Sequence, residues 1–67
     1  MSNELKKRSL EGLLSRTTTK LRAAQSLLRR FEERNGTVDC VAHNNLVATV
    51  EEYEEEIWAI NEDLKEL

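Results

Sequence analysis

The chain has 67 residues, of which 34% are charged, and it contains two glycines, no proline and one cysteine. A chain this short forms at most one small domain, whose core alone rarely stabilises a fold by more than about 3–5 kcal/mol. The single cysteine, Cys40, excludes an internal disulfide, and one cysteine with one histidine provides too few ligands for a closed zinc site. We therefore expect self-association or a partner to complete the fold.

Several function classes find no support in the sequence. No apolar run approaches the roughly 20 residues that a membrane-spanning helix needs. Residues 1–8 lack the continuous apolar stretch of a secretory signal, so we expect an intracellular chain, cytoplasmic or nuclear, with no membrane span. There is no glycine-rich phosphate loop, nucleophile motif or zinc-knuckle spacing. We accordingly predict no cofactor and no enzyme activity.

The first element expected in the chain is a helix over about residues 3–34. Ser2 or Asn3 is expected to cap its start, with Glu4 in the first turn. Gly12 lies off the apolar stripe and costs the helix about 1 kcal/mol relative to alanine. The stripe follows alternating steps of four and three residues, which is the seam pattern of a coiled coil: Leu10, Leu14, Thr17, Leu21, Ala24, Leu28 and Phe31.

Asn35 and Gly36 interrupt this pattern, and both residue types tolerate the left-handed conformation that ends helices. We expect a turn over about residues 35–38 and a second helix over about residues 39–66. Thr37 or Asp39 is expected to cap the second helix. Alternation of period two is absent, so no strand is predicted. The second stripe has the same rhythm as the first: Leu46, Val50, Tyr53, Ile57, Ile60, Leu64 and Leu67.

These elements predict an all-α fold, an antiparallel two-helix hairpin that forms a single domain over residues 1–67. A turn centred at Thr37 selects the register in which paired residue numbers sum to 74. The alternative is a straightened turn, giving one long helix that pairs with a second copy in a swapped arrangement. The predicted layers are Phe31–His43, Leu28–Leu46, Ala24–Val50, Leu21–Tyr53, Thr17–Ile57, Leu14–Ile60 and Leu10–Leu64.

The net charge of −3 conceals an asymmetry between the two halves of the chain. Residues 1–34 carry a net charge of +5 and residues 35–67 a net charge of −8. The halves should attract each other within one chain, or head to tail between chains. The basic first helix also raises an alternative function, a small nucleic-acid-binding accessory protein. We rank it second, because its charges are scattered, no aromatic residues are interleaved and the acidic helix cancels much of the field.

Four apolar residues lie outside the seam: Leu13, Leu27, Val47 and Trp58. The first three flank the seam and Trp58 lies further out. A two-helix seam does not bury them all, and wider apolar faces indicate further helices. We interpret them as the contact surface for another copy, as in a dimer of hairpins, or for a larger assembly. The alternatives are scattered exposed residues of the ordinary kind, and a Trp58 that folds over its own helix.

Two polar clusters could carry chemistry. Asp39, Cys40 and His43 are spaced to bind a metal weakly or after dimerisation, but no second Cys/His pair exists, so we predict no metal site. The acidic run over residues 51–56 contains carboxylates four residues apart. Such pairs perform acid–base chemistry only in a pocket that shifts their pKa values, and a hairpin offers none. We interpret the run as a solvated face.

Several short motifs together resemble a known family. Lys7-Arg8-Ser9-Leu10 leads into Leu13-Leu14-Ser15-Arg16, followed by Leu27-Leu28-Arg29-Arg30-Phe31, an Asn/Gly turn and an acidic helix with Leu46, Tyr53, Ile57 and Leu64. Over about residues 5–66 the chain resembles the N-terminal helical segment of gag-like polyproteins from Bel/Pao-type retrotransposons. The capsid and nucleic-acid-binding regions of a complete gag protein are absent. The resemblance implies a fragment or shortened derivative with a role in self-assembly, and it implies no catalytic residues.

Overall fold

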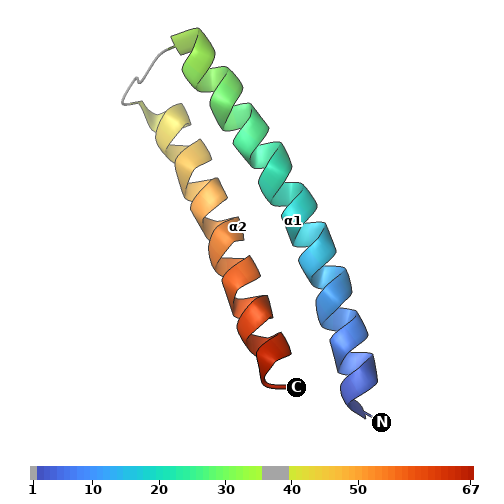
Figure 1. The fold of residues 1–67 in the computed structure, drawn as a ribbon. Helices are drawn as coiled ribbons and strands as arrows, with labels where there is room; N and C mark the ends of the chain where they lie inside the picture. Colours follow the sequence, from blue (N-terminus) through green and yellow to red (C-terminus); the bar gives the residue numbers. More distant parts are fainter. Residues whose placement is uncertain (1, 36–39) are drawn as a thin grey trace.

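The computed structural model describes residues 2–35 and 40–67, which form two antiparallel helices, α1 (Ser2–Asn35) and α2 (Val41–Lys65) (Figure 1). The predicted all-α, two-helix hairpin is confirmed. The hairpin measures 51 × 15 × 13 Å. Its length is that of α1, because 34 helical residues rise about 1.5 Å each. No segment of the described helices is long and apolar enough to cross a bilayer.

The ends of α1 extend slightly beyond the expected helix. It begins at Ser2 with Glu4 in its first turn, so Asn3 lies inside the helix and the expected cap by Asn3 is wrong. At the other end Asn35 is still helical, and its side-chain Nδ2 donates a hydrogen bond of 3.1 Å to the carbonyl oxygen of Phe31. Arg34 lies in the same last turn, where a cation interacts favourably with the helix dipole.

The start of α2 lies later than expected, at Val41. Its N-cap position is Cys40, with an extended backbone (φ −136°, ψ 165°) and no side-chain hydrogen bond to the helix. The N-cap position is therefore Cys40 and not Thr37 or Asp39, both of which lie outside the described part of the chain. A thiol is a weak acceptor, so the N-cap residue does not supply the strong hydrogen bond that an Asp or Thr at this position would.

Contact between the helices follows the two apolar stripes. The most deeply buried side chains are Thr17, Ala24, Val50 and Ile60, which are 3–9% exposed. Leu67, at the end of the second stripe, is 41% exposed. A single neighbouring helix covers a long side chain from one direction only, so most of the larger seam residues stay partly exposed to solvent. The half-buried ones are Leu10, Leu14, Leu21, Leu28, Phe31, Leu46, Tyr53, Ile57 and Leu64.

The register is visible at the turn end of the hairpin. The rings of Phe31 and His43 stack with their centroids 6.0 Å apart and an interplanar angle of 28°. Their residue numbers sum to 74, the value expected from the turn. Further along, Thr17 and Ile60 line one surface depression, as neighbouring layers of the same register require. Ala24 and Val50, both buried, share a layer in this register.

Gly12→Ala is expected to stabilise the hairpin. Gly12 lies in the helical interior of α1, and a Cβ built there meets nothing within 4 Å. Because glycine costs about 1 kcal/mol relative to alanine inside a helix, the free energy of unfolding should rise by about that amount. Urea denaturation followed by circular dichroism measures it. The matched control, Ala23→Gly on the exposed face of the same helix, should lose a similar amount. An unchanged stability for Gly12→Ala would contradict a folded first third of α1.

Candidate interaction surface

One row of residues along α1 repeats every seven positions and alternates basic and leucine side chains. Side chains seven apart lie on one face of a helix, here directly beside the seam. On α2, a row of small and acidic residues borders the seam from the same side. We call this side of the hairpin the leucine flank and define it by Lys6, Leu13, Lys20, Leu27 and Arg34 of α1 and by Thr49, Glu56, Ala59 and Asp63 of α2.

Three depressions lie in line along the leucine flank, each bounded by both helices. Each reaches a seam residue: Phe31 and Leu10 are half-buried, whereas Ile60 is buried, so the seam is open to solvent from this side mainly near its two ends. The depression nearest the turn is lined by Leu27, Arg30, Phe31, Arg34, Asn35 and Leu46. The second is lined by Leu13, Thr17, Lys20, Glu56, Ala59 and Ile60. The third, at the chain ends, is lined by Lys6, Ser9, Leu10, Asp63, Glu66 and Leu67.

Two leucines stand at the edges of these depressions. Leu13 is 42% exposed and Leu27 is 55% exposed. Each therefore offers apolar surface to solvent. Leu27 does so next to the half-buried Phe31 and Leu46, and Leu13 next to the buried Thr17 and Ile60. The leucine flank combines exposed leucines with a partly open seam, which a further helix could cover.

The two walls of the leucine flank carry opposite charge: the three charged residues that define its α1 wall are basic and the two that define its α2 wall are acidic, as in the two helices as a whole. α1 has nine Lys and Arg residues and four Glu residues, whereas α2 has one Lys and seven acidic residues. Within residues 2–35 and 40–67, no Lys or Arg nitrogen of α1 lies within 4.0 Å of a carboxylate oxygen of α2. The one Lys–Glu pair there, Lys65 with Glu62 at 3.4 Å, lies within α2. The expected attraction between the halves therefore forms no close Lys or Arg ion pair in the described hairpin.

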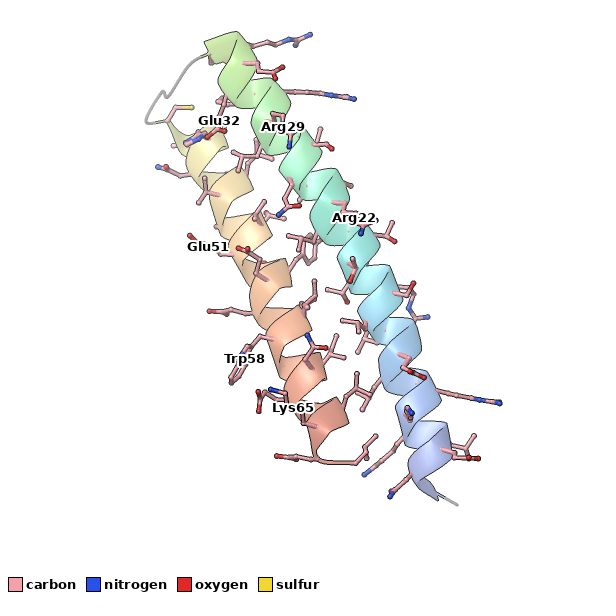
Figure 2. All side chains as sticks on the ribbon, in the orientation of Figure 1. Arg22, Arg29, Glu32, Glu51, Trp58 and Lys65 are labelled. Carbon is pink, nitrogen blue, oxygen red and sulfur yellow. The ribbon has the colours of Figure 1, made fainter. Side chains whose placement is uncertain are left out.

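The other two candidate interface residues lie on the opposite side of α2. Val47 and Trp58 are eleven residues apart, about three helical turns, and share one face. Val47 is half-buried, whereas Trp58 is 67% exposed and projects away from α1 (Figure 2). This exposure does not fit a Trp58 that folds over its own helix. We call this side the tryptophan flank and define it by Val47, Glu51, Glu54 and Trp58. The four candidates thus occupy two surfaces rather than one.

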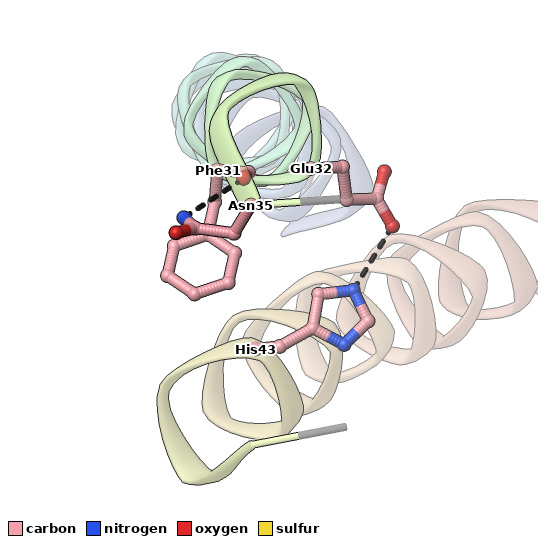
Figure 3. Close-up of polar contacts among 4 residues, drawn as sticks. All are labelled: Phe31, Glu32, Asn35 and His43. Carbon is pink, nitrogen blue, oxygen red and sulfur yellow. Dashed lines mark hydrogen bonds and ion pairs between the residues drawn. The ribbon is translucent and has the colours of Figure 1, made fainter. Parts of the chain in front are cut away.

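A small cluster joins the two helices at the turn end (Figure 3). His43 Nε2 lies 2.9 Å from Oε2 of Glu32, and the His43 ring stacks on Phe31. A carboxylate only accepts hydrogen bonds, so Nε2 carries the proton and donates it. The His43 side chain is 16% exposed. The heptad pattern predicts the pair Phe31–His43, but it does not predict the hydrogen bond between Glu32 and His43. The available signal was that Glu32 follows Phe31 directly, which places it within reach of the same partner.

Neither of the two polar clusters forms a metal site or a pocket in the described structure. In the part of the chain that the structure describes, no group of three or more His, Cys, Asp or Glu side chains is arranged to hold a metal ion. Asp39, the third member of the Asp39–Cys40–His43 cluster, lies outside that part. The five glutamates of the acidic run are all exposed on α2: Glu51, Glu52, Glu54, Glu55 and Glu56.

Comparison of the chain with protein-family models, with curated proteins and with solved structures finds no match. The resemblance to gag-like polyproteins stays a prediction.

Glu32→Ala is expected to destabilise the hairpin by about 1 kcal/mol, because it leaves the partly buried Nε2–H of His43 without its acceptor. Chemical denaturation at neutral pH measures the change. Glu33→Ala is the matched control, since Glu33 is exposed and is the next residue in the same last turns of α1. Both variants remove one negative charge near the helix C-terminus, so their difference isolates the hydrogen bond to His43. Equal stabilities of the two variants would show that this bond contributes nothing.

Proposed function

We propose that this chain is a non-enzymatic helical module that binds protein and self-associates. The observation that carries the proposal is the thinness of its core. Among the described residues, the buried apolar side chains are Ala24, Val50 and Ile60, and no large side chain is fully buried. A core of this size leaves a 67-residue chain marginally stable, and oligomerisation is one of the usual aids for such chains.

The exposed apolar residues support the same proposal. Leu13, Leu27 and Trp58 each expose more than two fifths of their surface, and the two leucines adjoin half-buried seam leucines. Interfaces between proteins bury such residues, and tryptophan is among the residues that contribute most to binding. The depressions of the leucine flank lie between two helices at the surface, whereas catalysis needs a site that excludes water. A gag-like origin, which the sequence resemblance implies, would assign the chain the same role in self-assembly.

Sedimentation equilibrium over a range of protein concentrations tests the proposal. We expect the mean mass to rise from that of the 7.8 kDa chain toward a multiple of it, and thermal stability to rise with concentration, because association stabilises the folded state. Leu21→Asp, which places a charge in the seam, should unfold the chain. A helical monomer whose stability is independent of concentration would refute self-association.

Nucleic-acid binding through α1 is the second candidate function. The observation that favours it is that the basic side chains of α1, including Arg22 and Arg29 (Figure 2), form no close ion pair with the described part of α2. If this is the function, the chain should bind random-sequence DNA or RNA at low salt, with an affinity that falls steeply as salt rises. Arg22→Gln combined with Arg29→Gln should weaken binding, whereas the control Glu51→Gln should not. Absence of binding at low salt removes this candidate.

A further inference from the structure

We infer that the leucine flank is the docking surface for a second copy of this chain. We infer also that the two-fold axis of the dimer runs parallel to the helices, so that α1 of each copy packs on α2 of the other. The inference rests on the proposed self-association and adds the surface and the symmetry.

The composition of the two flanks favours the leucine flank. Its depressions reach seam residues, and Leu13 lines one of them together with the small side chain of Ala59. The charged residues of the tryptophan flank, Glu51 and Glu54, are both acidic, so two such flanks would repel each other. The leucine flank carries charges of both signs, and covering it also covers the seam residues that its depressions reach, so it is the better surface for a second copy.

The area of the flank suits a second hairpin. A face of the 51 × 15 Å hairpin has the area that each partner of a stable complex buries, which is about 800 Å². A second copy has the same length and offers the same open seam. Two such faces together give a four-helix bundle, in which every seam side chain gains a second neighbouring helix.

Charge selects the symmetry of this bundle. Two two-fold arrangements bring the leucine flanks together and keep adjacent helices antiparallel. With the axis perpendicular to the helices and in the plane of the interface, α1 packs on the partner's α1, so the strongly basic helices and the strongly acidic helices repel in pairs. With the axis parallel to the helices, α1 packs on the partner's α2, and each basic wall meets an acidic wall. Since α1 carries nine Lys and Arg residues and α2 seven acidic residues, the second arrangement is favoured.

The same axis determines which residues meet. Rotation about this axis leaves the position of every residue along the bundle unchanged. A residue of α1 therefore faces the same level of the partner's α2 as of its own α2, where the two residue numbers sum to about 74. Lys20 then lies between the partner's Glu52 and the partner's Glu56. Leu13 lies beside the partner's Ala59, whose small side chain leaves room for it. The charged contacts that a single hairpin does not form are thereby made between copies.

Salt gives the first test. We expect dimerisation of the wild-type chain to weaken as salt is added, because screening reduces attraction between opposite charges. Dimerisation that strengthens with salt would overturn the inferred symmetry, since that response belongs to like charges brought together. Trp58 stays outside this interface, so its fluorescence should change little when the dimer forms.

Matched variants test the surface. Leu27→Asp should weaken the dimer by at least about 100-fold, because each dimer buries two copies of Leu27. Trp58→Asp, on the tryptophan flank, should leave the dissociation constant within about threefold of wild type.

Lys20→Glu and Glu56→Lys should each weaken self-association by about tenfold, and an equimolar mixture of the two should form a heterodimer with restored affinity. Circular dichroism of each variant shows whether it retains its helices, and Leu13→Asp replaces Leu27→Asp if the latter unfolds.

A spin label on the native Cys40 tests the axis directly, because this half-buried residue precedes α2 at the turn end. With the axis parallel to the helices both turns lie at the same end, and the labels should be about 15–30 Å apart, from diagonal helices of a bundle with about 10 Å between neighbours. With the perpendicular axis they should be about 40 Å apart, the rise of the 27 residues from Cys40 to Leu67.

The possible failures are distinguishable. A wild-type chain that stays monomeric at all concentrations overturns the proposed self-association and this inference with it, and leaves a helix of a different protein as the occupant of the flank. A dimer that tolerates Leu27→Asp and Leu13→Asp but is lost with Trp58→Asp overturns the surface alone. A dimer with labels about 40 Å apart overturns the symmetry alone.

Discussion

The hairpin depends on an apolar seam that each helix covers from one side only. Along this seam Thr17, Ala24, Val50 and Ile60 become buried, whereas Ile57, the leucines and the aromatic residues remain partly exposed. A long side chain needs neighbours in several directions to leave water, and two helices do not provide them. The same limit accounts for the depressions that reach seam residues from the leucine flank. Further burial requires another helix, and this requirement connects the fold to the proposed function.

Like the apolar seam, the charged side chains of the two helices find only part of their contacts within one hairpin. α1 is strongly basic and α2 strongly acidic, yet in the described residues the Lys and Arg side chains of α1 make no close ion pair with α2. Exposed ion pairs contribute little to stability, so the hairpin does not depend on them. Opposite charges on two walls of one surface do influence how a second molecule approaches and in which orientation. Apolar seam and charge pattern thus act at different levels, the first on folding and the second on assembly.

At the turn end of the hairpin, contacts between the two helices hold the first turn of α2 in place. α2 begins at Val41, and its N-cap residue, Cys40, makes no side-chain hydrogen bond to the helix. One turn later His43 stacks on Phe31 and donates a hydrogen bond to Glu32, which ties the first turn of α2 to the last turns of α1. These contacts join residues that the seam alone brings together, and they hold the register at the end where the chain reverses direction.

The sequence by itself determined the two helices, their antiparallel pairing and the residues of the seam, because heptad spacing and an Asn-Gly interruption are local properties of the chain. It also identified Leu13, Leu27, Val47 and Trp58 as residues that the seam leaves over. Only the tertiary structure decided that these four divide between two flanks, that Glu32 reaches His43, and that α2 starts at Val41. The physical reason is that a flank is formed by both helices together. Its composition depends on which rows of α1 and α2 the antiparallel packing brings to the same side, and spacing within either helix does not contain that information.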